Sequence, residues 1–198
     1  MENTKNAPEK NKEENVLFLP FVTALAGAII LVMAFFLPYA SATKEHKQYL
    51  KTYSDEMYAE EINMTNKEAV GISMLEYVRV YAMAAQMEIS KEYKLIGIIC
   101  VVLMSVIGAF SLLTLLFAAL KKPIALFIFN GITFGVFRML CWDFADRGVV
   151  PNYNYVWGIS YYLYHAGAII VLIGAVWLFV IKIRMKHQGK GMSLADAT

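Results

Sequence analysis

The chain has 198 residues, of which 59% are hydrophobic and only 17% are charged, and its formal net charge is +2. This charge content excludes an ordinary soluble domain, which needs about a quarter charged residues, and the hydrophobicity excludes a disordered chain. A nucleic-acid-binding protein is also excluded, because it needs a dense basic patch that this net charge does not supply, so the composition predicts an integral membrane protein.

Four apolar segments are long enough to cross a bilayer, since a helix needs about 20 apolar residues to span a hydrocarbon core of about 30 Å. They are residues 16–37, 95–120, 123–142 and 161–181. None of them has the strict alternation of apolar and polar residues that a membrane-spanning β-strand shows. The sequence therefore predicts an all-α integral membrane protein with four transmembrane helices.

The first predicted span, 16–37, has an alternative interpretation as a signal peptide. Pro38 and the small residues 40–42 form a cleavage pattern, and cleavage there would leave three spans. However, the apolar run exceeds the usual length of about 7 to 15 residues, and the tail 1–15 before it is not net basic. We therefore expect this span to be retained, with Gly27 on a small-residue face where another helix can dock.

The segment 38–94 between the first two spans is too long to be a plain tether. Its stretches 43–62 and 65–87 have apolar residues at helical spacing, and the second opens with a capping box at Thr65 and Glu68. We expect a hairpin of two amphipathic helices outside the membrane. Their apolar stripes either pack only on each other or leave a tyrosine-rich surface for a partner. That predicted partner-binding surface comprises Tyr53, Tyr58, Tyr77, Tyr81 and Trp157.

The second predicted span, 95–120, contains Cys100. Cys141 in the third span lies at a similar distance from the turn 121–122, so both sulfurs are expected in the same half of the bilayer. They are either buried free thiols or a structural disulfide, which requires Cα atoms within about 7 Å. No CxxC motif or zinc-type spacing accompanies them.

The third predicted span, 123–142, carries the most informative polar residues. Gly131 and Gly135 form a GxxxG pair that lets another helix approach closely, and Arg138 falls on the same face. Arg138 is either a staple that holds the bundle together or the lining of an anion or proton-coupled path. Asn130, beside the glycines, is expected to hydrogen-bond across helices.

The fourth predicted span contains His165 one turn inside its outer end. Helical angles place this histidine nearly opposite a seam formed by Gly167 and Gly174. We therefore do not expect it to face Arg138, for which loop carbonyls and acidic residues such as Asp143 are the expected partners.

Lysine and arginine in the short connections set the orientation. The turn 121–122 consists of two lysines and the tail 182–198 is also basic, so both are predicted to be cytoplasmic, together with the tail 1–15. The loops 38–94 and 143–160 are then extracytoplasmic. All 12 tyrosines fall in these loops or at the outer ends of the spans, and the second loop is aromatic.

The main functional hypothesis is a membrane-embedded binding protein that acts as an accessory, regulatory or assembly subunit through its tyrosine-rich outer hairpin. The alternative is a self-associating channel or transporter that uses Arg138. A third hypothesis is a membrane thiol oxidoreductase that uses Cys100 and Cys141. An enzyme is the less favoured class, and we expect no cofactor, no metal and no catalytic residue.

The expected partners are the lipid bilayer and either another membrane or extracytoplasmic protein or a second copy of the chain. No nucleic acid is expected to bind. The expected location is the cell membrane, with both termini in the cytoplasm. Two cysteines cannot form a disulfide framework, which favours a bacterial source.

Overall fold

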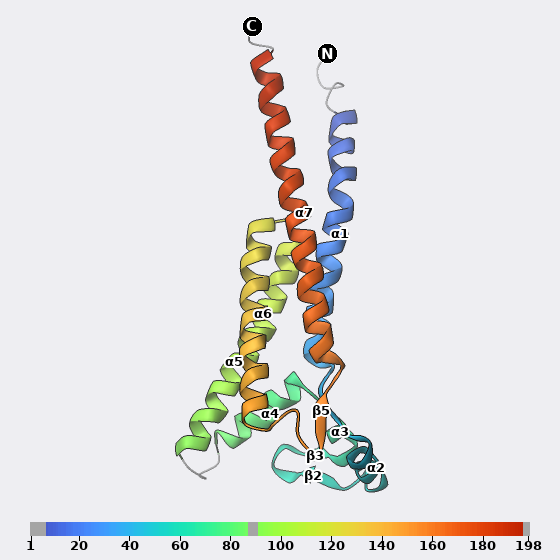
Figure 1. The fold of residues 1–198 in the computed structure, drawn as a ribbon, viewed down its shortest axis with the longest axis vertical. Helices are drawn as coiled ribbons and strands as arrows, with labels where there is room; N and C mark the ends of the chain where they lie inside the picture. The colour runs from blue at the N-terminus through green and yellow to red at the C-terminus, as the bar shows by residue number, and fades with distance from the viewer. Residues whose placement is uncertain (1–6, 87–90, 196–198) are drawn as a thin grey trace.

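A computed structural model describes residues 7–86 and 91–195, and it is 77% helical. Four long helices dominate it (Figure 1). They are α1 (Ala7–Phe36), α5 (Lys91–Ala119), α6 (Pro123–Asp146) and α7 (Ile159–Ala195). Each of the four contains a segment that is long and apolar enough to cross a membrane. The predicted multi-pass helical membrane protein is consistent with this architecture.

The tightest helix pair in the bundle is α1 with α7, because small residues line both sides of the contact. A Cβ added at Gly174 would lie 2.5 Å from the backbone nitrogen of Ala24. A Cβ added at Gly27 would lie 2.7 Å from the backbone nitrogen of Val171. Since real Cβ atoms do not approach other atoms this closely, only glycine allows the two backbones to meet here.

Helices α1 and α7 extend past the turn that joins α5 to α6, as Figure 1 shows. At 1.5 Å per residue, the 37 residues of α7 are about 55 Å long, whereas the hydrocarbon core is about 30 Å thick. The parts of α1 and α7 that extend past the α5–α6 turn, together with that turn and its residues Lys121 and Lys122, form one end of the bundle. We call it the basic end.

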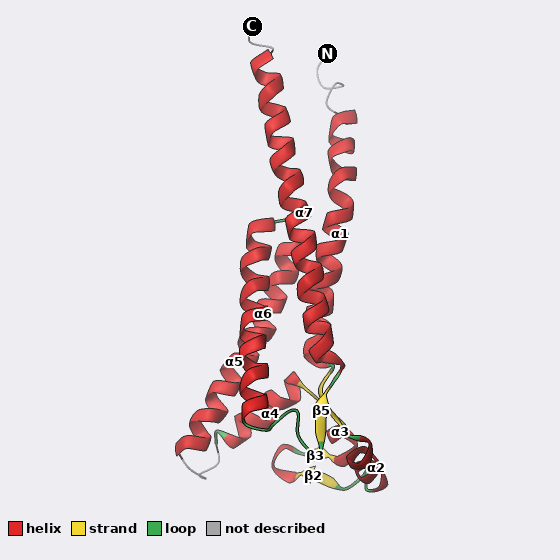
Figure 2. Ribbon diagram, viewed as in Figure 1, coloured by secondary structure: helices red, strands yellow, loops and turns green. Residues whose placement is uncertain are grey.

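Short strands and helices gather at the opposite end of the bundle (Figure 2). They come from residues 37–86 and 147–158, and we call them the loop domain. The first segment contributes β1 (Pro38–Ala42), α2 (Lys44–Thr52), β2 (Met57–Ala59), η1 (Glu60–Ile62), β3 (Met64–Thr65), α3 (Asn66–Ala69), β4 (Gly71–Ser73) and α4 (Met74–Ala84). The second segment contributes β5 (Tyr155–Trp157).

A three-stranded antiparallel sheet joins the two segments of the loop domain, with the strand order β4-β1-β5. The central strand β1 pairs Ala40 with Ile72 on one side and with Trp157 on the other. Strands β2 and β3 form a separate two-stranded sheet. Because β1 directly follows α1 and β5 directly precedes α7, this sheet continues the helix pair α1–α7 out of the bundle.

The predicted hairpin of two amphipathic helices is wrong for most of the first segment. Only α2 and α4 are helices of more than one turn there, and strands interrupt both predicted stretches. The capping box at Thr65 and Glu68 is present, but the helix that it opens ends at Ala69. The strands form because residues distant in sequence offer them hydrogen-bond partners, which helical periodicity does not reveal.

A second capping box, at Ser73 and Glu76, begins α4 and was not predicted. The Glu76 carboxylate accepts from the Ser73 backbone N–H at 2.6 Å, and the Ser73 hydroxyl accepts from the Glu76 N–H. The predicted end of the second loop helix, Met87, lies outside the described residues, as do parts of the predicted tails 1–15 and 182–198.

Candidate binding site

A pocket of about 260 Å³ opens in the loop domain. The β2–β3 hairpin, α4 and the second segment of the loop domain each supply part of its wall. Its lining includes Tyr58, Tyr77, Val80, Asn152 and Tyr155. Most of the remaining lining is aliphatic, so the pocket is an apolar and aromatic cavity with a few hydroxyl and amide groups.

Hydrogen bonds hold the far wall of this pocket in place. The Tyr155 hydroxyl donates to the backbone oxygen of Ala69 at 2.8 Å, which ties β5 to the end of α3. The Asn152 side-chain oxygen accepts from the backbone N–H groups of Asn154 and Tyr155, each at 2.8 Å. These bonds are complete without a ligand, so this wall of the pocket is preformed.

The two buried tyrosines of the pocket, Tyr77 and Tyr155, keep their phenol protons at physiological pH. Burial raises the pKa of Tyr77 and of Tyr155 above the usual tyrosine value, and a hydrogen bond with Tyr58 raises that of Tyr155 further. Tyr58 lies at the mouth with 41% of its surface exposed, whereas Tyr77 and Tyr155 are buried. The pocket therefore suits an uncharged apolar or aromatic group. A group that enters the pocket contacts Tyr58 first.

The five residues predicted as one partner-binding surface do not form one exposed surface in the structure, although the rings of Tyr77 and Tyr81 stack on each other. Tyr58 and Tyr77 line the pocket, but Tyr77 is buried. Tyr53 is exposed elsewhere, against Tyr49. The other two are engaged in packing or polar contacts, namely Trp157 stacked on Tyr161 and Tyr81 beside Arg147.

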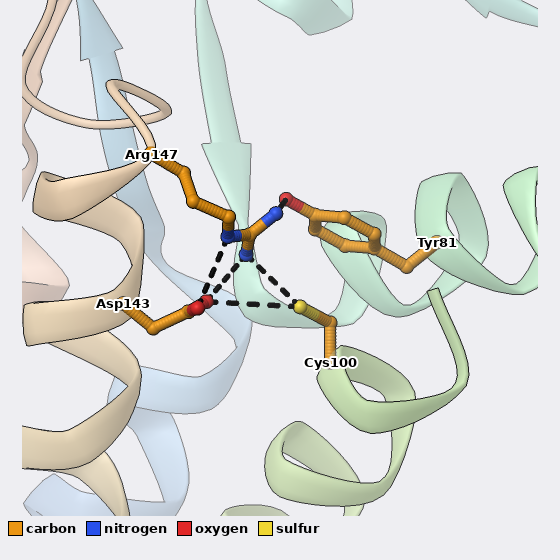
Figure 3. A network of polar contacts seen from close by, with 4 residues as sticks. All are labelled: Tyr81, Cys100, Asp143 and Arg147. Atoms are coloured by element: carbon orange, nitrogen blue, oxygen red, sulfur yellow. Dashed lines mark hydrogen bonds and ion pairs between the residues drawn. The ribbon is translucent and has the colours of Figure 1, made fainter. Parts of the chain in front are cut away.

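A polar network joins α4, α5 and the end of α6 close to the loop domain (Figure 3). Arg147 forms an ion pair with Asp143 one turn earlier, and its Nε also donates to Asp143 at 3.0 Å. The same guanidinium donates to the Cys100 sulfur at 3.1 Å and to the Tyr81 hydroxyl at 3.4 Å. Burial raises the pKa of Tyr81 to about 12, so this hydroxyl remains protonated.

Arg147 was not among the predicted site residues, and Asp143 was expected to pair with Arg138. Within the described part of the chain, Arg147 with Asp143 is the only ion pair. Their spacing of four residues was a readable signal, because it places two side chains next to each other on a helix. We interpret this network as a polar link that holds α4, α5 and the end of α6 together, and we call it the clamp.

Removing one partner of this clamp is expected to destabilise the protein. Asp143→Asn leaves the Arg147 guanidinium without its carboxylate, and we expect a loss of about 1–2 kcal/mol of unfolding free energy. Breaking a fully buried ion pair typically lowers the free energy of unfolding by about 3–5 kcal/mol. The loss is smaller here because the side chain of Asp143 is 33% exposed and that of Arg147 is 25% exposed. Thermal unfolding in detergent micelles measures the change.

A double-variant cycle provides the control for the clamp. Arg147→Gln combined with Asp143→Asn removes both charges, and we expect the double variant to be more stable than the sum of the two single losses predicts. Strictly additive losses would show that the two residues act independently, which would contradict the clamp.

Two predicted polar residues of the spans do face each other, contrary to expectation. Arg138 Nη1 lies 3.3 Å from His165 Nε2. The glycine seam of α7, which includes Gly174, packs on α1, so the opposite side of α7 carries His165 toward α6. Asn130 also bridges these helices, because its amide donates to the backbone oxygen of Ala168 at 3.1 Å.

The remaining predicted residues have different surroundings. Among the described residues, no atom of another element lies within 4 Å of a Cβ added at Gly131 or Gly135, so no helix packs against α6 at these two positions. Cys100 and Cys141 are free thiols rather than a disulfide. Cys141 accepts a hydrogen bond from the Tyr39 hydroxyl at 3.4 Å.

Comparison with known proteins adds no assignment. No protein-family model, no curated protein and no solved structure matches the chain. Among the described residues, no group of three or more histidine, cysteine, aspartate or glutamate side chains is placed to hold a metal ion.

Proposed function

We propose that this chain is an accessory, regulatory or assembly subunit of the cell membrane that binds a partner protein through its loop-domain pocket. The distribution of charge supports an extracytoplasmic loop domain, because Lys121, Lys122, Lys182 and Lys186 gather at the basic end, opposite the loop domain, and basic residues beside spans favour the cytoplasmic side. The partner is then a periplasmic or extracellular protein, or the outer part of another membrane protein.

The single observation that carries this proposal is the preformed aromatic pocket. Its volume of about 260 Å³ is below the range of about 300–1,000 Å³ that is typical of small-molecule sites, but it accommodates one or two side chains. Protein interfaces commonly place one aromatic or long aliphatic residue in such a pocket. We infer that the partner inserts an uncharged anchor residue past Tyr58, between Tyr77 and Tyr155.

Filling the pocket is expected to abolish partner binding. Val80 lies on the pocket side of α4 and is only partly buried, so Val80→Trp places an indole in the cavity. Leu75→Trp adds the same side chain at an exposed position of the same helix, outside the pocket, and serves as the matched control. We expect Val80→Trp to weaken binding at least tenfold and Leu75→Trp to leave it unchanged.

Site-specific photo-crosslinking measures this binding in the native membrane. A benzophenone amino acid replaces Tyr58 at the mouth of the pocket in the full chain, and native mass spectrometry of the purified complex gives the stoichiometry. A parallel probe at Tyr153, which is 92% exposed and does not line the pocket, reports nonspecific capture. Equal adducts from both probes, or an adduct that Val80→Trp does not reduce, would contradict the proposal.

A further inference from the structure

A second groove lies at the basic end of the bundle, between the start of α6 and the side of α7. Its volume is about 560 Å³. Its floor is apolar and includes Phe117, Ile128 and Phe179. Its rim carries the three lysines Lys122, Lys182 and Lys186. No acidic side chain is among the residues that line it.

The lysines of the rim are available to an anion. Lys122 and Lys186 are exposed, and neither has a carboxylate partner among the described side chains. Lys182 donates to the backbone oxygen of Lys121 at 2.6 Å, which holds its ammonium close to the α5–α6 turn. The Lys121 ammonium itself is directed elsewhere, over the ring of Phe21 at 4.7 Å.

The groove lies where hydrocarbon meets headgroups if the four apolar helices cross a bilayer. Helix α5 ends at Ala119 and α6 begins at Pro123, so Lys122 marks the boundary of two spans. Ile124 and Ile128 are largely exposed on the adjoining face of α6, as expected for a surface in contact with lipid. The lysines are thus at headgroup depth, and the apolar floor is at the depth of the acyl chains.

We propose that this groove binds an anionic phospholipid. One acyl chain lies along the floor at Phe117 and Phe179, and the phosphate lies among the ammonium groups of Lys122, Lys182 and Lys186. A zwitterionic lipid carries its own cation, which three lysines repel, so charge selects a headgroup with a net negative charge. A lipid held there connects the α5–α6 turn to α7.

Native mass spectrometry tests this proposal on the full chain, purified and delipidated in a neutral detergent. Phosphatidylglycerol and phosphatidylcholine with identical acyl chains are the two probes. We expect phosphatidylglycerol to bind at least tenfold more tightly. Each lysine near an anionic lipid contributes a factor of about five, so the double variant Lys122→Gln/Lys186→Gln should lower the affinity for phosphatidylglycerol about 25-fold and leave that for phosphatidylcholine unchanged.

Three controls separate the proposal from simpler explanations. Lys44→Gln/Lys47→Gln removes the same charge from an exposed face of α2 and should have no effect. Lys122→Arg/Lys186→Arg keeps the charge and should keep the selectivity, which also shows that substitution at these positions preserves the fold. Ala125→Trp places a bulky ring on the floor and should weaken binding of the full lipid.

Several results would overturn the proposal. Equal affinity for the two lipids would remove the role of the lysines. If glycerophosphoglycerol, the headgroup without acyl chains, bound as tightly as phosphatidylglycerol, the site would recognise a free phosphate group rather than a lipid. Full binding to Ala125→Trp would show that no acyl chain lies on the floor of the groove.

Discussion

Replacing Tyr39 by alanine is expected to lower the free energy of unfolding by about 3–5 kcal/mol, the usual range for deleting a buried aromatic ring. Tyr39 has no exposed surface, and its ring lies between the bundle and the loop domain. Its ring centroid is 5.7 Å from that of Phe144 in α6, 5.4 Å from that of Trp157 in β5 and 6.2 Å from that of Tyr77 in α4.

Tyr39→Phe is the matched control for this loss. This variant keeps the ring and removes only the weak hydrogen bond to the Cys141 sulfur. We therefore expect it to lower the free energy of unfolding by less than about 1 kcal/mol. Unfolding in detergent micelles, followed by tryptophan fluorescence, compares the variants because Trp157 adjoins the ring. Equal losses for alanine and phenylalanine would show that the hydroxyl, and not the packing of the ring, holds the two parts together.

Gly174→Ala is expected to destabilise the protein by about 3 kcal/mol, although it adds a single methyl group. That methyl would lie 2.5 Å from the backbone nitrogen of Ala24 and 2.7 Å from its Cα, and neither atom can move without displacing α1. The two helices must separate, which is the overpacking that typically costs about 1–3 kcal/mol in a close-packed core. Thermal unfolding in detergent measures the change.

Two other glycines of the chain, Gly131 and Gly135 of α6, are matched controls for Gly174. Gly131→Ala and Gly135→Ala add the same methyl to another long apolar helix, α6, but at positions where no atom of another described element lies within 4 Å. We expect them to change the stability of the monomer by less than about 1 kcal/mol, in the stabilising direction, because alanine has the higher helix propensity. Similar losses at all three glycines would contradict the assigned seam between α1 and α7.

The four long helices were predictable because the requirement that produces them is local. A stretch such as 95–120 must bury every backbone polar group within itself if it crosses hydrocarbon, and an uncharged helix does so without any other part of the chain. The position of a helix among its neighbours is not local. Gly131 shows this, because the sequence identifies small residues but not which of them will meet a partner helix.

The loop domain was less predictable because it depends on pairing between distant residues. Strands β4 and β5 have only three residues each, too few to show alternation, and both pair with β1 from a different part of the chain. Tyr58 and Tyr77 were singled out as tyrosines on a helical hairpin. Their meeting with Asn152 and Tyr155 in one pocket follows from the sheet, which the sequence alone did not reveal.

The continuity of α1 with β1 and of β5 with α7 has a mechanical consequence. One residue separates the end of α1 at Phe36 from the start of β1 at Pro38, and one residue, Gly158, separates β5 from α7. Both junctions are therefore too short to let the helix and the strand move independently. Ser160 donates to the backbone oxygen of Ala34 at 2.6 Å, and the Gly158 N–H donates to that of Tyr39 at 2.8 Å, which brace both junctions. A force that slides or twists α1 against α7 is therefore transmitted directly to the paired strands β1 and β5.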